Sequence, residues 1–247
     1  MIMKTAKILS IFSLFVASVF FMSSCTPDPV VVTPEEYGKV LLFHGAPGSA
    51  PVDLFIDGAK STIASLAYGQ FSNYVKTLAG TTVHKLQTKN VTGGIIDSVN
   101  LKVNKDVGYS YYVYKDNDAT GTIRTITTTD ALTAPAAGKA KIRFVNLIPD
   151  IPNNIALDIE AVATGGSPTN RNDFTNVKFK DSKDFIEIAK GTYDLKVKQT
   201  GTVNLVISAP TNVTLVEGKI YTFVAHGFNS KINSDPQTAK ISTVNNN

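Results

Sequence analysis

The chain has 247 residues, a net charge of +4, 43% hydrophobic residues, a single cysteine and no tryptophan. Its lysines and arginines are scattered and form no block, which excludes the basic footprint of a nucleic-acid-binding protein. One cysteine excludes an intramolecular disulfide framework. The length suits one large domain or two modest ones.

The N-terminus has the pattern of an export signal. Two lysines precede an apolar run from Ile8 to Met22, which is short for a membrane-spanning helix. The run ends in Ser23-Ser24-Cys25. This ending resembles a bacterial lipobox, and in signals of that kind cleavage leaves the cysteine as an acylated N-terminus. We therefore predict that residues 1–24 are removed and that Cys25 anchors the protein to a membrane through its acyl chains.

Two alternatives to lipidation are an ordinary cleaved signal with an incidental cysteine and an uncleaved membrane anchor. Lipidation is favoured because it explains a lone cysteine in an exported protein, where a free thiol would be a liability. Residues 25–37, which contain three prolines, are predicted to form an extended tether.

The expected location is the outer membrane, where the protein is lipid-anchored and either periplasmic or surface-exposed. Thr26 follows the cysteine, so the aspartate of an enterobacterial inner-membrane retention signal is absent. Acidic residues in the tether mildly resemble the surface-export signals of Bacteroidota lipoproteins, although they are not clustered beside the cysteine.

The rest of the chain has an all-β pattern. Short apolar runs are separated by Gly, Pro, Asn and Asp, and no long stretch has a helical period. In a first unit, residues 38–129, the predicted strands are Val40–His44, Val52–Ile56, Ile63–Leu66, Phe71–Leu78, Val83–Thr88, Ile95–Val103, Tyr109–Tyr114 and Thr122–Thr128. Residues 130–138 are small and are predicted to form a flexible linker between domains.

A second unit, residues 139–247, repeats this plan. Gly191 falls where Gly80 falls, and both are predicted to need a positive φ. The predicted strands are Lys141–Leu147, Ile155–Ile159, Phe179–Ile188, Tyr193–Gln199, Asn204–Ser208, Val213–Val216, Ile220–Ala225 and Ala239–Val244, with Thr164–Asp173 as a polar insertion. We predict two tandem antiparallel β-sandwiches, immunoglobulin-like in outline.

The first unit resembles a known family. It carries the motifs K-V-x-x-x-H-x-x-P-x-x-x-x-V-D-L-F-I-D-G, A-Y-G-x-x-S-x-Y and L-A-G-T, and residues 38–114 are similar in this way to the DUF4397 family of bacterial cell-envelope β-domains. In the second unit only the outline remains: Asn146 replaces His44, Glu160-Ala161 replaces Asp57-Gly58, and Phe179-Lys180 replaces Tyr68-Gly69. The resemblance implies an exported β-sandwich repeat and no activity.

No set of residues indicates catalysis. His44, His84 and His226 have no partners at metal-ligand spacing, so we expect structural roles for them, and Asn146 in place of His44 agrees because it too can bond a loop backbone. There is no G-x-S-x-G, P-loop or dinucleotide motif. We predict that the protein is not an enzyme, has no catalytic residue and needs no cofactor.

A weak calcium-loop candidate contains Asp116, Asp118 and Thr120. Oxygen ligands at alternate positions before a glycine suit calcium, but Thr127 stands where an EF-hand needs its acid. A plain hairpin loop without metal is therefore the favoured interpretation.

Tyr112 and Tyr114 are predicted to point away from the core tyrosines Tyr109 and Tyr111. If exposed, they would form a surface for a sugar or a protein. Burial against the neighbouring unit is the favoured alternative, and the absence of tryptophan weakens the sugar-binding interpretation.

Together these patterns predict a non-catalytic, lipid-anchored cell-envelope protein whose sandwich repeats are binding or spacer modules. The alternative is a glycan-binding accessory lipoprotein or adhesin. The expected partners are the membrane, through the acyl anchor, and an envelope protein or glycan, with no nucleic acid.

Overall fold

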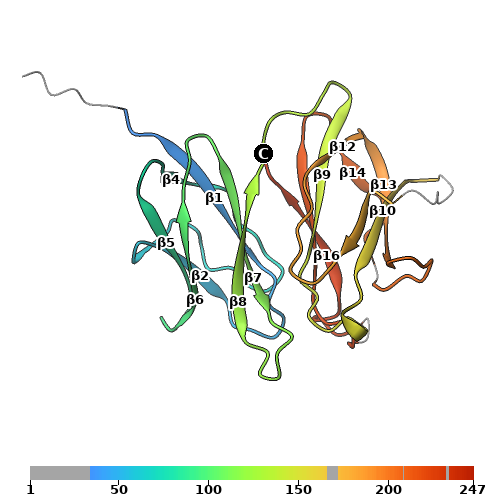
Figure 1. Ribbon diagram of the computed structural model, residues 1–247, viewed down its shortest axis with the longest axis horizontal. Helices are drawn as coiled ribbons and strands as arrows, with labels where there is room; N and C mark the ends of the chain where they lie inside the picture. Colours follow the sequence, from blue (N-terminus) through green and yellow to red (C-terminus); the bar gives the residue numbers. More distant parts are fainter. Residues whose placement is uncertain (1–33, 166–171, 208, 232–233) are drawn as a thin grey trace, which may run out of the picture. The chain divides into compact units, whose positions relative to one another are not determined.

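A computed structural model describes residues 34–165, 172–207, 209–231 and 234–247, and Glu35–Asn247 forms one compact unit. The predicted signal, Cys25, most of the tether and much of the polar insertion lie outside the described residues. The described part contains sixteen β-strands and one short 3₁₀ helix at Pro152–Asn154 (Figure 1). No helix within it is long and apolar enough to span a membrane.

The first sandwich consists of two four-stranded sheets, ordered β4-β1-β7-β8 and β3-β2-β5-β6. Neighbouring strands are antiparallel except for β1 and β7, which are parallel. The strands are β1 Tyr37–His44, β2 Val52–Ile56, β3 Ala59–Lys60, β4 Val75–Leu78, β5 Val83–Asn90, β6 Ile95–Lys102, β7 Gly108–Lys115 and β8 Ile123–Asp130.

The second sandwich repeats this order strand for strand, as β12-β9-β15-β16 and β11-β10-β13-β14, again with one parallel pair, β9 and β15. The predicted all-β fold and the tandem sandwiches are confirmed. The strands are β9 Lys139–Asn146, β10 Leu157–Ala163, β11 Phe174–Val177, β12 Ile186–Ala189, β13 Gly191–Gln199, β14 Val213–Leu215, β15 Ile220–His226 and β16 Lys240–Asn245.

Each sandwich differs in detail from an immunoglobulin domain. A constant-type immunoglobulin domain has seven strands, in four- and three-stranded sheets. Here eight strands form two sheets of four, and the first strand lies beside the seventh. The likeness is therefore one of outline, because residue patterns identify strands without identifying which strands are neighbours.

Some predicted strands are wrong or misplaced. Ile63–Leu66 is not a strand: both its end residues are buried in the core, and only Leu66 pairs, through one bridge to Val52. Likewise Leu205 makes only an isolated bridge to Lys198. The two short strands β3 and β11 were missed because they are too brief to give a clear alternation.

The register of β10 corrects one predicted equivalence. Asp158 lies opposite Lys198 in the same way that Asp53 lies opposite Lys89. The counterpart of Asp57-Gly58 is therefore residues 162–163, not Glu160-Ala161 as predicted. The longer loop before β10 accounts for the shift.

The two cores are built on the predicted aromatic positions. Tyr109 and Tyr111 are buried on β7, and Tyr221 and Phe223 are buried on β15. The Tyr109 hydroxyl accepts a hydrogen bond from the Asn104 amide at 3.1 Å. The Tyr221 hydroxyl accepts one from the Val216 amide at 3.2 Å, five residues upstream in both cases. Each tyrosine thus ties its strand to the preceding turn.

The loop after the first strand of each sandwich confirms the structural role expected of His44. Its Nδ1 accepts a hydrogen bond from the Ala46 amide at 3.4 Å. In the second sandwich, Asn146 Oδ1 accepts one from the Ile148 amide at 3.1 Å. Burial lowers the pKa of His44 to about 4, so the ring is neutral at neutral pH.

Matching backbone turns complete the repetition. The Gly69 amide donates to the His44 carbonyl and the Lys180 amide to the Asn146 carbonyl, both at 2.7 Å. Lys180 has a φ of 71° where Gly69 has 81°, so the lysine adopts a left-handed conformation that glycine adopts at no cost.

Candidate functional site between the two sandwiches

The two sandwiches pack against each other through the outer faces of the sheets that contain their first strands. Figure 1 shows β7 and β8 beside β9 and β16 at this junction. Because side chains alternate along a strand, every second residue points away from its own core and toward the other sandwich. A buried apolar cluster results, formed by Leu41, Phe43, Tyr112, Tyr114, Val145, Leu147, Val224 and Val244.

Tyr112 and Tyr114 do not form the exposed ligand surface considered from the sequence. They are only 1% and 4% exposed because the second sandwich covers them. The Tyr114 ring makes an edge-to-face contact with Phe179, 5.7 Å between ring centroids. The alternation predicted from the sequence is correct, and burial against the neighbouring unit is the outcome.

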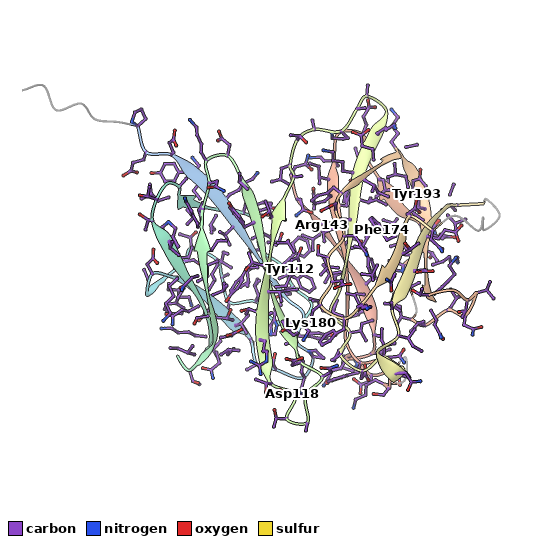
Figure 2. All side chains as sticks on the ribbon, viewed as in Figure 1. Tyr112, Asp118, Arg143, Phe174, Lys180 and Tyr193 are labelled. Atoms are coloured by element: carbon purple, nitrogen blue, oxygen red, sulfur yellow. The ribbon has the colours of Figure 1, made fainter. Side chains whose placement is uncertain are left out.

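Arg143, on β9, is the polar centre of the interface and is 1% exposed (Figure 2). Its Nη2 lies 2.6 Å from Asp130 Oδ1 and donates to the Tyr112 hydroxyl at 2.8 Å. Its Nε donates to Thr222 Oγ1 at 2.8 Å. A buried ion pair with additional hydrogen bonds offsets the cost of removing both charges from water.

Asp130 lies in the same network, although the sequence assigned it to the linker. It is the last residue of β8 and accepts hydrogen bonds from Ser110 Oγ at 2.7 Å and from the Tyr74 hydroxyl. Burial and the negative charge of Asp130 raise the pKa of Tyr74. The Tyr74 hydroxyl also accepts a hydrogen bond from Asn246 Nδ2 of the second sandwich, at 2.9 Å.

Sequence reasoning missed the Arg143–Asp130 pair. The available signal was a charged residue at an outward-facing position of the otherwise apolar run from Ile142 to Val145. In a strand buried on both faces, such a residue needs a buried partner. The partner lies in another domain, and no sequence spacing indicates it.

His226 lies elsewhere in the same interface and is fully buried. Its Nδ1 is 3.0 Å from the Tyr68 hydroxyl of the first sandwich, and its Nε2 is 2.8 Å from Ser242 Oγ. Its ring also contacts Phe43 edge-on, at 5.3 Å between centroids. Burial lowers the pKa of His226 to about 3, so it is neutral at physiological pH.

His84 also has structural partners at both ring nitrogens: Asp57 Oδ2 at 2.6 Å and the Leu78 carbonyl at 2.7 Å. Among the described residues, no group of three or more histidine, cysteine, aspartate or glutamate side chains is placed to hold a metal ion.

The candidate calcium loop forms a hairpin closed by its own side chains. Asp118 Oδ1 accepts a hydrogen bond from the Thr122 amide at 2.9 Å, and such bonds lower the pKa of Asp118 to about 2. Asp116 contacts Arg124 at 2.8 Å and Lys180 at 3.4 Å. These cations pair with the carboxylate of Asp116, one of the three residues of the calcium-loop candidate.

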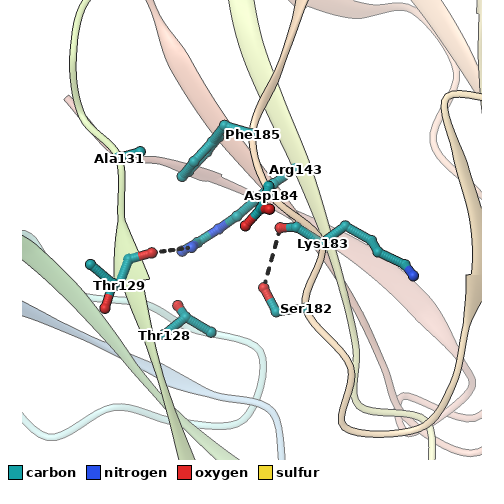
Figure 3. Close-up of a pocket in the computed structure, with 8 residues that line it drawn as sticks. All are labelled: Thr128, Thr129, Ala131, Arg143, Ser182, Lys183, Asp184 and Phe185. Atoms are coloured by element: carbon teal, nitrogen blue, oxygen red, sulfur yellow. Dashed lines mark hydrogen bonds between the residues drawn. The ribbon is translucent and has the colours of Figure 1, made fainter.

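A cleft of about 340 Å³ opens beside Arg143, between the two sandwiches (Figure 3). Arg143 Nη1 points across it to the Thr129 carbonyl at 3.3 Å, and the Phe185 ring lies 4.5 Å from the guanidinium carbon. Hydrogen-bonding groups beside an aromatic face suit a small polar ligand. The lining residues are Thr128, Thr129, Ala131, Arg143, Ser182, Lys183, Asp184 and Phe185.

Comparisons with known proteins give one family. Residues 38–160 match the model of a family described as "Domain of unknown function (DUF4397)". The match covers the first sandwich and continues into β10. No curated protein matches the chain.

One similar solved structure is titled as a leucine-rich repeat protein from Bacteroides thetaiotaomicron VPI-5482. It is 12% identical over 84% of this chain, with a TM-score of 0.20, and this chain spans 27% of it. A likeness this distant carries no argument about fold or function.

Proposed function

We propose, from the premise that residues 38–160 carry a DUF4397 domain, that this is a non-catalytic, lipid-anchored protein of the bacterial cell envelope. Its two sandwiches act together as one binding or spacer module. The observation that carries this proposal is the buried interface, in which Arg143 of one sandwich is paired with Asp130 of the other. A charged pair held out of water favours a fixed arrangement over two freely jointed domains.

The second sandwich is proposed to be a divergent copy of the same domain. Three features support this: the same strand order, the Tyr109 and Tyr221 ties, and the His44 and Asn146 loop contacts. The non-catalytic proposal is supported by the three histidines, each of which is held by structural partners.

The anchor is proposed to be an acylated Cys25 in the outer membrane, on its periplasmic or outer side. The test is growth with an alkyne fatty acid, followed by detection of the label on the protein. Cys25→Ser should lose the label and leave the membrane fraction, whereas Ser24→Ala, which keeps a small residue before the cysteine, should retain both. Equal labelling of Cys25→Ser would overturn the anchor.

Crosslinking on intact cells, followed by purification through a C-terminal tag, tests whether the two sandwiches bind another envelope component. Recovery of one protein in near-equal amount is expected of a subunit in an envelope complex. Hydrolysis of a glycan or peptide by the purified protein at an enzyme-like rate would contradict the non-catalytic proposal.

A second candidate function is glycan binding, and the cleft beside Arg143 is the observation that favours it. Ala131 lines this cleft and is exposed, so Ala131→Trp should fill it without disturbing the ion pair. Calorimetry against a polysaccharide panel should detect binding that is lost in Ala131→Trp and kept in Ala137→Trp, an exposed control in the linker. No binding by the unmodified protein across a broad panel would remove this candidate.

A further inference from the structure

The interface has a pseudo-twofold character. Tyr68 of the first sandwich contacts His226 of the second, at 5.1 Å between ring centroids, and Phe179 of the second contacts Tyr114 of the first, at 5.7 Å. Tyr68 and Phe179 precede the matching turns at residues 69 and 180. The same two positions therefore meet twice in exchanged roles, which is the mark of an isologous contact.

Strand registers identify Tyr114 and His226 as equivalent. Val113 lies opposite His44 in the first sandwich, and Ala225 lies opposite Asn146 in the second. Tyr114 and His226 are the residues that follow. Each sandwich therefore presents the same face to the other, as two subunits of a symmetric dimer would.

The polar positions repeat as well. Ser110 Oγ donates to Asp130 at 2.7 Å, and Thr222 Oγ1 donates to Asn246 at 2.7 Å. Asp130 pairs with Gly108, and the Asn246 amide bonds to the Ile220 carbonyl, at equivalent places in the two sheets. An asparagine in the second sandwich thus stands where the first has an aspartate.

The positively charged residue of the interface, in contrast, is present only in the second sandwich. Arg143 lies opposite Thr222, whereas the equivalent residue, Leu41, lies opposite Ser110. The first sandwich therefore contributes a buried carboxylate and no buried cation at these positions. The second contributes a buried guanidinium and no carboxylate.

Self-pairing of either sandwich would leave these charges without partners. Two first sandwiches joined through this face would bury two copies of Asp130 facing Leu41. Two second sandwiches would bury two copies of Arg143 facing Asn246. An unpaired buried charge is far more costly than a paired one, so each homotypic arrangement is disfavoured relative to the observed one.

We propose that the Arg143–Asp130 pair is a specificity device: the outer face of each sandwich binds a sandwich of the other kind and rejects its own kind. The partner that this surface fits is the opposite half of the chain, held close by the linker at residues 131–138. Neighbouring molecules therefore do not associate through like halves, although they share an almost symmetric interface.

The test uses the full chain, with a protease site inserted after the exposed residue Ala134 and cleaved after folding. Native mass spectrometry then identifies which halves are bound to each other. The unmodified interface should give only the one-to-one pair of unlike halves. Asp130→Asn combined with Arg143→Leu gives both faces the same residues at these two positions and removes the buried charges, so pairs of like halves should form beside the unlike pair.

Glu36→Gln with Lys105→Leu is the matched control, because it removes an exposed ion pair of 2.9 Å within the first sandwich. It should behave as the unmodified protein. Like pairs, or complete dissociation, in the unmodified protein would overturn the proposal, as would unlike pairs alone in the double variant.

A second readout covers the case in which the cleaved halves precipitate. In the uncleaved chain, Asp130→Asn and Arg143→Leu should each lower the thermal midpoint more than the two changes together do. Additive losses would contradict a pair that acts as a unit.

Discussion

The two sandwiches meet the same structural need with different side chains. In the first, His84 Nε2 bonds to the carbonyl of Leu78, the last residue of β4, at 2.7 Å. In the second, the Tyr193 hydroxyl donates to the carbonyl of Ala189, the last residue of β12, also at 2.7 Å. The fold requires a donor that reaches this carbonyl, and either ring supplies it. A buried histidine in one repeat is therefore weak support for chemistry when the other repeat replaces it with a tyrosine.

The two faces of the first sandwich teach a second lesson. On β2 and β5 the outer face keeps water-facing groups, such as Lys89 over the Phe55 ring at 4.0 Å. On β7 nearly every residue is buried, whichever face of the sheet its side chain lies on. In both sheets the side chains alternate between the two faces. Only the outer face that the second sandwich covers lacks water-facing groups.

The largest predicted effect comes from breaking the charged pair that distinguishes the two faces. Arg143→Leu leaves Asp130 buried without a cation and should lower the free energy of unfolding by about 3–5 kcal/mol. Urea denaturation measures this loss of stability. Lys105→Leu, at an exposed ion pair, should change the free energy of unfolding far less. Similar losses in both variants would remove the special role of the interface.

Acid should weaken the interface through His226. Its folded-state pKa, about 3, lies below the usual value near 6.5, so the unfolded chain binds more protons between these values. The contribution of the neutral His226 to the free energy of unfolding is fully present above about pH 6.5 and is lost as the pH falls toward 3.

Thermal midpoints between pH 7.5 and 4.5 test this dependence. His226→Gln, whose side chain does not titrate, should flatten the curve relative to the unmodified protein. His44 has a pKa of about 4 and contributes in the same direction, so part of the slope should remain. An unchanged slope in His226→Gln would contradict the prediction.

A matched pair of substitutions sharpens the comparison of the repeats. Tyr109→Phe and Tyr221→Phe each remove the hydroxyl that accepts a backbone hydrogen bond, from Asn104 and Val216 respectively. Each should cost about 1 kcal/mol of stability. Chemical denaturation of both variants should give losses that agree closely, and a several-fold difference would argue against equivalent roles.

The smallest expected effect is a gain at the matching turns. Lys180 has a positive φ, so Lys180→Gly should relieve strain and raise the unfolding free energy by up to about 1 kcal/mol, less what its contact with Asp116 contributes. Gly69→Ala, at the same turn of the first sandwich, should be destabilising. Denaturation midpoints of both variants measure whether each substitution raises or lowers stability. A loss of stability in Lys180→Gly would contradict the predicted backbone strain.

Much of the fold follows from local pattern, and the site does not. The alternation of β5 and the aromatic positions of β7 and β15 predicted strands and cores correctly, because both depend on neighbours along the chain. The equivalence of His44 and Asn146 was also readable, since both bond a loop amide. Gly80 lies in a bend with a positive φ of 133°, as predicted, whereas Gly191 is the first residue of β13 and its φ of 158° is close to extended.

What the sequence did not reveal depends on distant residues. Tyr112 and Tyr114 pointed outward as predicted, but the sheet that covers them belongs to the other repeat. The mostly aromatic run at residues 109–114, interrupted only by Ser110, is typical of a strand buried on both faces. The pairing of Arg143 with Asp130 had no such signal, because it depends on how two domains meet.

The hydrogen bond between Tyr74 and Asn246 joins residues 172 positions apart, which has a consequence for the order of assembly. The first sandwich can pair its own strands early, but its outer face cannot be covered until almost the whole chain is present. During that interval Phe43 and Tyr112 face water on the uncovered outer face of the sheet, a surface prone to aggregation. A chain with such distant contacts folds slowly in its last step, and that step is where help from a chaperone would matter most.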